Sequence, residues 1–128
     1  MSYQPQFKVK ATYMRGGTSK GTFFNIADLP KEAQEDTKKR DKLLQRIVGS
    51  PDVYKQQMDG MGGATSSTSK AILVGKSDVP GHDVDYYFCQ VAIDKDFVDM
   101  SGNCGNLSSA VGPFAIKEGL VDNVPENG

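Results

Sequence analysis

The sequence contains no tryptophan, one histidine and two cysteines among its 128 residues. Two cysteines cannot form the disulfide framework that stabilises many small secreted domains. Cys89 and Cys104 are also not spaced as the ligands of a zinc knuckle. We therefore expect neither a disulfide scaffold nor a structural metal site.

Long apolar runs and an excess of one charge are also missing. No stretch is long enough to span a bilayer, and the opening residues, MSYQPQFKVK, lack the apolar core of a signal peptide. The 15 basic residues are balanced by 16 acidic ones, which gives a net charge of -1. This balance argues against binding to nucleic acids or membrane surfaces. We expect a cytoplasmic protein with no nucleic-acid partner and no membrane partner.

The length and composition fit a single globular domain that covers residues 1–128. The chain is 38% hydrophobic and 24% charged, which is ordinary for such a domain. A helix is expected over residues 27–49, with Asp28 as its cap, Pro30 in its first turn and Gly49 at its end. Alternating or apolar runs predict strands over residues 7–14, 22–26, 71–75 and 83–94.

A second helix is expected over residues 106–119, NLSSAVGPFAIKEG. It is apolar almost all round, up to and including Ile116, so we expect it to lie inside a core. Pro113 stands in its interior, where it should remove a backbone hydrogen bond or bend the helix. The whole pattern predicts an α+β domain in which strands surround one buried helix.

The six residues 101–106, SGNCGN, place Cys104 between flexible residues at the expected start of that helix. Unpaired N–H groups in a first helical turn stabilise a thiolate and can also hold a carboxylate. Gly102 and Gly105 would let the backbone approach a ligand closely. A tight turn around a buried cysteine fits the same residues. Cys89 lies in the apolar run YYFCQV and is interpreted as a buried core residue, and His82 as a surface turn residue.

Two further stretches are rich in glycine and hydroxyl side chains, and each contains a lysine near its end. They are YMRGGTSKG over residues 13–21 and DGMGGATSSTSK over residues 59–70. Neither is a P-loop or a dinucleotide fingerprint. Their backbone N–H groups, hydroxyls, arginine and lysines suit the binding of several carboxylates. Solvated flexible loops are the alternative interpretation.

Taken together, YMRGGTSKG, DGMGGATSSTSK, HDVDY and SGNCGN resemble the PrpF family of 2-methylaconitate cis–trans isomerases, in this order and from about Phe7 to Leu120. That family is similar in fold to diaminopimelate epimerase, in which two halves each wrap a mixed or antiparallel sheet around a central helix. The resemblance implies that this chain is the N-terminal half of such an enzyme, with the active site completed by a C-terminal half. Without that half, we expect the uncovered cleft face to favour a homodimer.

The resemblance also implies which residues face the substrate. Lys70 and Cys104 are implied as the catalytic residues. The substrate-binding residues that it implies are Arg15, Gly16, Gly17, Ser19, Ser67, Asn103, Gly105 and Asn106. It implies a small tricarboxylate as substrate, and neither a cofactor nor a metal.

A mechanism follows from the chemistry of an aconitate-type acid. Removal of a proton from the methylene carbon spreads negative charge through the alkene into a carboxylate, rotation becomes easy, and reprotonation at that carbon gives the other isomer. Such a step needs a base, a proton return and donors aimed at the enolate oxygens. Lys70 is the candidate base or proton carrier, and Cys104 is either its acid/base partner or part of a carboxylate site.

Two alternative functions stay open at this point. The first is a cofactor-independent amino-acid racemase or epimerase of the same fold, which typically uses two cysteine-type groups, one from each half. The lysine that closes SSTSK favours the isomerase over this alternative. The second is a carboxylate-binding or assembly fragment without turnover.

Overall fold

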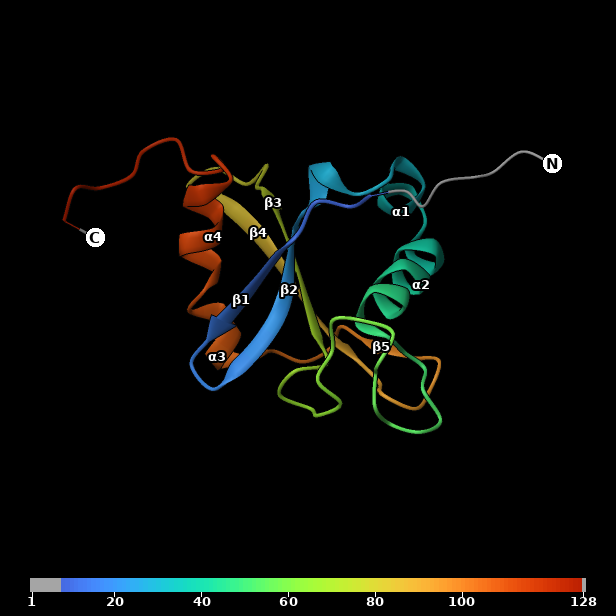
Figure 1. The fold of residues 1–128 in the computed structure, drawn as a ribbon. Helices are drawn as coiled ribbons and strands as arrows, with labels where there is room; N and C mark the ends of the chain where they lie inside the picture. The colour runs from blue at the N-terminus through green and yellow to red at the C-terminus, as the bar shows by residue number, and fades with distance from the viewer. Residues whose placement is uncertain (1–7, 128) are drawn as a thin grey trace.

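The computed structural model describes residues 8–127, and a five-stranded sheet forms its centre (Figure 1). The strand order follows the chain, and β2 and β3 are the parallel neighbours, while every other neighbouring pair is antiparallel. This mixed sheet with flanking helices confirms the predicted α+β class. The strands are β1 (Thr12–Gly16), β2 (Ser19–Asn25), β3 (Lys70–Lys76), β4 (Val84–Val91) and β5 (Val98–Asp99).

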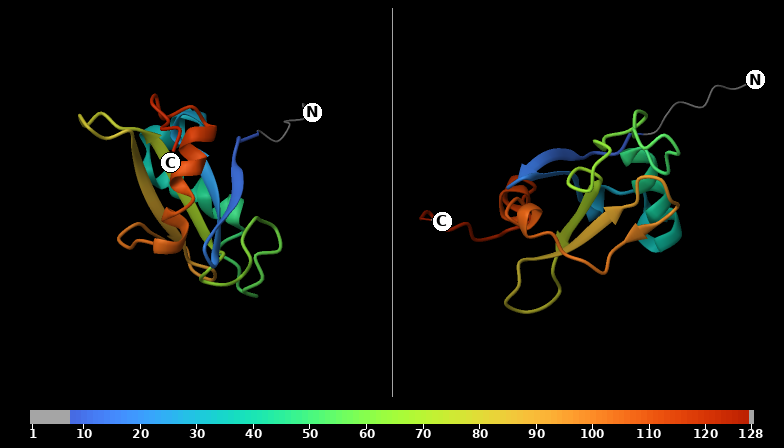
Figure 2. Two further views of the ribbon diagram at one scale, coloured as in Figure 1. Left: turned by 90° about the vertical axis from the view of Figure 1, so that its left-hand side faces the viewer. Right: turned by 90° about the horizontal axis from the view of Figure 1, so that it is seen from below.

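Helices cover both faces of the sheet, as Figures 1 and 2 show. Because side chains alternate along a strand, β2, β3 and β4 each contribute to two separate cores. One core packs on α3 (Gly105–Ser108) and α4 (Val111–Lys117) and includes Phe23 and Ile72. The other lies on the side of α1 (Lys31–Glu35) and α2 (Thr37–Val48) and includes Phe24 and Cys89.

The first strand differs from its prediction. Phe7 lies outside the described residues. β1 begins at Thr12 and continues through Arg15 and Gly16, which lie between the two predicted strands. The reason is pairing: Arg15 lies opposite Lys20 and Gly16 opposite Ser19, so β1 and β2 form a hairpin with a two-residue turn. The predicted strands around residues 22–26, 71–75 and 83–94 are confirmed as β2, β3 and β4.

The helix expected over residues 27–49 is divided. Residues Ile26–Asp28 form a short 3₁₀ helix, and Pro30 is the N-cap of α1, so the prediction that Asp28 caps the helix is wrong. Asp36 is the cap of α2, because its side chain accepts from the N–H groups of Lys38 and Lys39. Gly49 ends α2 in the left-handed conformation, as predicted.

The second predicted helix is also divided, and this explains its proline. The helix is interrupted between α3 and α4, so Pro113 lies in the first turn of α4 rather than in a helix interior. An N–H group in that turn has no partner within the helix, so proline removes no hydrogen bond there. Only one side of α4 is buried: Phe114 is 1% exposed, whereas Ile116 is 48% exposed. The expectation that Ile116 lies in the core is therefore wrong.

Within residues 8–127, no helix combines the length and the apolar character that a membrane-spanning segment needs. His82 lies exposed in the loop before β4, as predicted.

Candidate active site

The predicted catalytic residues meet at one edge of the sheet. Because β2 and β3 run parallel, their first residues, Ser19 and Lys70, begin at the same edge. Lys70 alternates with Ala71, so it shares the face of Ile72 that packs on α3. Cys104 is the N-cap of α3 at this edge. Parallel pairing therefore places together side chains that are distant in the sequence.

Ser19, Lys70 and Cys104 are in direct contact. Lys70 Nζ donates to Cys104 Sγ at 3.2 Å and to Ser19 Oγ at 3.1 Å. The Cys104 thiol lies 3.7 Å from Ser19 Oγ, within reach of a hydrogen bond to sulfur. Ser19 is 2% exposed, and Lys70 and Cys104 are 8% exposed. The structure therefore brings the two predicted catalytic residues together with one predicted binding residue.

These contacts favour the thiolate of Cys104. Burial raises the pKa of the Cys104 thiol. The hydrogen bonds that the Leu107 N–H and Lys70 donate to the sulfur, the hydrogen bond between Cys104 and Ser19, and the lysine's charge outweigh burial and lower this pKa. For Cys89, burial outweighs the charge of Arg40 and raises the pKa of the thiol to about 12. Cys89 is fully buried, which confirms its interpretation as a core residue.

Two aromatic residues of β4 complete the surroundings and were missed from the sequence. The ammonium of Lys70 lies 5.7 Å from the centre of the Phe88 ring, a cation–π contact. The hydroxyl of Tyr86 donates to Asn103 Oδ1 in the cysteine loop. Burial raises the pKa of Tyr86, and the charge of Cys104 raises it further. The alternation of side chains in VDYYFCQV indicates that Tyr86 and Phe88 share one face of the strand. That this face lies beside Lys70 follows only from the pairing of β4 with β3.

The β1–β2 hairpin docks on the first turn of α3 and so fixes Ser19. A Cβ on Gly16 would lie 2.5 Å from the carbonyl oxygen of Asn106, and a Cβ on Gly17 would overlap the Asn106 side chain. Asn106 Nδ2 also donates to Thr18 Oγ1 at 3.0 Å. Gly16, Gly17 and Asn106 thus lie beside the site, and in this structure they pack the hairpin against α3.

Within the described residues, the other predicted binding residues form no hydrogen bond with the side chains of Ser19, Lys70 or Cys104. Arg15 alternates to the opposite face of β1 from Gly16, and its Nε donates to the carbonyl of Gly17 at 3.0 Å. Ser67 is exposed, and its carbonyl accepts from the N–H of Lys20 at 3.0 Å. Asn103 and Gly105 are exposed, and a Cβ on Gly105 would meet open space. Their roles as substrate ligands stay predictions.

The glycines of DGMGGATSSTSK have a different use from the one expected. The N–H groups of Met61 and Gly62 donate to the carbonyls of Ile47 and Val48 at the end of α2. A Cβ on Gly60 or on Gly62 would overlap backbone atoms of that helix end or the side chain of Gln57. These two N–H groups are therefore occupied within the fold and are not available to a carboxylate. Carboxylate binding by the hydroxyls and the lysine of this stretch stays a prediction.

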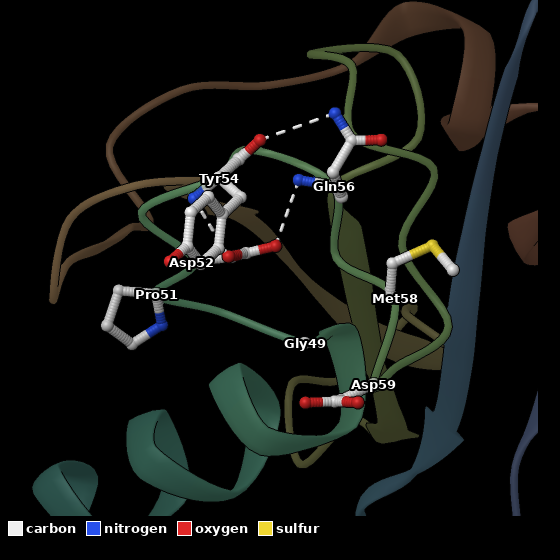
Figure 3. Close-up of a pocket in the computed structure, with 7 residues that line it drawn as sticks. All are labelled: Gly49, Pro51, Asp52, Tyr54, Gln56, Met58 and Asp59. Atoms are coloured by element: carbon white, nitrogen blue, oxygen red, sulfur yellow. Dashed lines mark hydrogen bonds between the residues drawn. The ribbon is translucent and has the colours of Figure 1, made fainter.

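Figure 3 shows a pocket beside the end of α2. Its volume is about 400 Å³, and neither Lys70 nor Cys104 lines it. None of its lining residues was predicted to bind substrate; they are Gly49, Pro51, Asp52, Tyr54, Gln56, Met58 and Asp59. Across residues 8–127, no three His, Cys, Asp or Glu side chains gather closely enough to hold a metal ion.

Comparisons with known proteins found a matching family model and several similar proteins. The chain matches the family model described as "PrpF protein" over residues 6–126. It is 62% identical over 130 residues to 2-methyl-aconitate isomerase of Cupriavidus necator, covering 100% of this chain and 33% of that protein. It is 50% identical over 119 residues to 3-methylitaconate isomerase of Eubacterium barkeri, covering 93% of this chain and 30% of that protein. The chain thus spans about a third of the length of these curated relatives.

A solved structure shares the fold. The crystal structure of methylitaconate-delta-isomerase superposes with a TM-score of 0.81 at 50% sequence identity, covering 91% of this chain and 28% of that one. This similarity confirms the fold that the sequence motifs led us to expect.

Proposed function

This chain belongs to the PrpF family, and we propose that it forms the N-terminal part of a cofactor-independent isomerase. The proposed reaction is cis–trans isomerisation of an aconitate-type unsaturated tricarboxylate, with 2-methylaconitate as the first candidate. The names of the similar proteins support this choice, because they are isomerases of unsaturated acids. We also propose that a further half of the same protein closes the site and that the enzyme acts in the cytoplasm.

The single observation that carries the proposal is the contact between Lys70 Nζ and Cys104 Sγ at 3.2 Å. The reaction takes a proton from the methylene carbon and returns it to the same carbon, so it needs groups that exchange protons beside the substrate. Lys70 and Cys104 supply two such groups at one point. Ser19 links them through hydrogen bonds to both.

The electrostatics supports an acid/base role for Cys104 over a role in carboxylate binding. The fold lowers the pKa of this thiol, and a thiolate repels a substrate carboxylate. The positive charge of Lys70 balances the thiolate and attracts the anionic substrate. We assign the proton transfer to the pair, in which one member accepts the proton and the other stabilises the charge that develops.

A racemase of this fold would take one cysteine from each half, so the burial of Cys89 on the opposite face of the sheet does not bear on that alternative. The feature of this half that favours the isomerase is the lysine beside the thiol of Cys104. The described residues thus bring one cysteine and one lysine to the site.

The test is proton exchange during turnover. A protein of the relatives' length that carries this chain is incubated with the cis and trans acids in deuterated water, and NMR follows the isomer ratio and the deuterium at the methylene carbon. We expect interconversion with deuterium uptake. Interconversion without uptake would overturn the proton-transfer mechanism, and exchange at the α-carbon of amino acids would favour the racemase.

A matched experiment tests the proposed second half. The 128-residue chain alone should show neither interconversion nor exchange, because half a site does not hold the substrate or exclude water. Its mass in solution reports whether two copies associate. Sustained isomerisation by a monomer of this chain would show that one half suffices.

A further inference from the structure

Gln57 is a buried amide to which the proposed mechanism gives no task. It is 1% exposed, and its backbone has a φ of 50°, a conformation that residues other than glycine rarely adopt. Its Nε2 donates to Ser50 Oγ at 2.9 Å and to Ser69 Oγ at 2.8 Å, and its Oε1 accepts from the Ala64 N–H at 2.7 Å. Both amide hydrogens and the amide oxygen are therefore used.

One of these bonds leads directly to the candidate active site. Ser69 is fully buried and immediately precedes Lys70. Its hydroxyl donates to the Val91 carbonyl at 2.6 Å, and its own carbonyl accepts from the Val91 N–H at 3.0 Å. Gln57 and Val91 thus hold Ser69 from two sides, at the point where β3 begins.

Gln57 is itself held by a carboxylate. Asp52 accepts from the N–H groups of Gln57 and Gln56 at 2.9 Å and from that of Tyr54 at 3.0 Å. Figure 3 shows Asp52 between Tyr54 and Gln56. The bonds from Gln56 and Tyr54 are the chief reason that the pKa of Asp52 is lowered. The unfavourable backbone conformation at Gln57 is thus supported by local hydrogen bonds.

We propose that Gln57 is a positioning residue, which sets the place of Lys70 against Cys104 by fixing Ser69 and the loop 60–69. The proposal rests on the proposed role of Lys70 in proton transfer. The structural basis of the proposal is independent of that role. The Gln57 amide is hydrogen-bonded to Ser69 at the start of β3, and the ammonium of the next residue, Lys70, lies 3.2 Å from the Cys104 thiol.

The test compares two buried glutamines. Gln45 is 3% exposed, and its side chain donates from α2 to Asp96 and makes no bond to Ser69. Gln57→Leu and Gln45→Leu both remove a buried amide, so both should lower the unfolding temperature. The rate of Cys104 alkylation is then measured against pH in this chain. We expect the profile of Gln57→Leu to move to higher pH, because the lysine leaves the thiol, and that of Gln45→Leu to stay unchanged.

A second variant keeps the test decisive if Gln57→Leu does not fold. Ser69→Ala cuts the same path but keeps the bonds of Gln57 to Ser50 and Ala64, and it should move the profile in the same direction. An unchanged profile in the folded variants, or an equal shift in Gln45→Leu, would overturn the proposal. Alkylation needs no turnover, so this outcome is distinct from a failure of the proposed function. In the longer enzyme, Gln57→Leu should lower kcat on the order of tenfold to a hundredfold with little change in KM.

Discussion

Lys70 Nζ lies 3.2 Å from Cys104 Sγ, although 34 positions separate the two residues in the chain. The lysine begins β3 and the cysteine caps α3, so the contact depends on how the helix docks on the sheet. It gives the site a buried pair of proton-exchanging groups, and the thiol owes part of its lowered pKa to it.

The two cysteines should differ sharply in reactivity. We expect iodoacetamide near neutral pH to label Cys104 before Cys89, because the fold lowers the pKa of one thiol and raises that of the other to about 12. Mass spectrometry of digested samples measures both rates. A tricarboxylate should slow the labelling of Cys104. Equal labelling, or labelling of Cys89 first, would contradict the account of the site.

Lys70→Ala should affect turnover much more than substrate binding. A residue that exchanges a proton acts mainly in the transition state, and its loss typically costs about two to four orders of magnitude in kcat. Steady-state kinetics and a binding titration on the longer enzyme separate the two effects. Lys76→Ala is the control, since Lys76 ends the same strand and pairs with Asp122 on the surface. A Lys70→Ala enzyme that binds poorly but turns over normally would make Lys70 a carboxylate ligand.

Gly17→Ala should destabilise the hairpin that carries Ser19. Gly17 has a φ of 54°, and a Cβ there would overlap the side chain of Asn106. Gly81 is the control: its φ is 84°, and a Cβ at that position would meet no atom within 4 Å. Gly81→Ala therefore measures only the free-energy cost of holding an alanine in the left-handed conformation, about 1–2 kcal/mol. Urea unfolding measures both, and Gly17→Ala should lose more free energy of unfolding. Equal losses would mean that the contact with Asn106 contributes nothing.

Gly105→Ala separates ligand approach from folding. A Cβ at this position meets open space, and alanine is a good helix former, so the free energy of unfolding should fall by no more than about 0.5 kcal/mol. If the substrate approaches this backbone closely, as predicted, its binding should weaken. Calorimetric titration of the longer enzyme checks this, and unchanged affinity would remove Gly105 from the substrate-binding residues.

Stability should fall in alkali because of Cys89. The unfolded thiol loses its proton near the ordinary value of 9.0, whereas the folded one keeps it to about 12. Above pH 9 the unfolded state therefore binds fewer protons, and the free energy of unfolding falls by up to about 1.4 kcal/mol per pH unit until about pH 12. Denaturant unfolding at several pH values between about 8 and 11 gives the free energy of unfolding at each pH. This free energy should fall less steeply with pH in Cys89→Ala than in the unmodified chain. An equal fall with pH in both proteins would contradict the effect.

The sequence by itself determined the local chemistry of this protein. Alternation predicted β2, β3 and β4, the apolar run around Cys89 predicted its burial, and the residues around Cys104 predicted a thiol at a helix start. These features depend on residue type and short spacing, which can be read along the chain. The assignment of Lys70 and Cys104 as the catalytic pair came from the resemblance of the motifs to the PrpF family.

The tertiary structure alone decided what those residues touch. Parallel pairing of β2 with β3 brought Ser19 to Lys70, and β4 brought Phe88 to the same lysine. Because the loop 60–69 packs on the end of α2, the N–H groups of Met61 and Gly62 donate to carbonyls of that helix and are not available to an anion. The break before α4 placed Pro113 where its missing N–H has no cost. Such outcomes depend on contacts between segments far apart in the sequence, and local propensity carries no information about them.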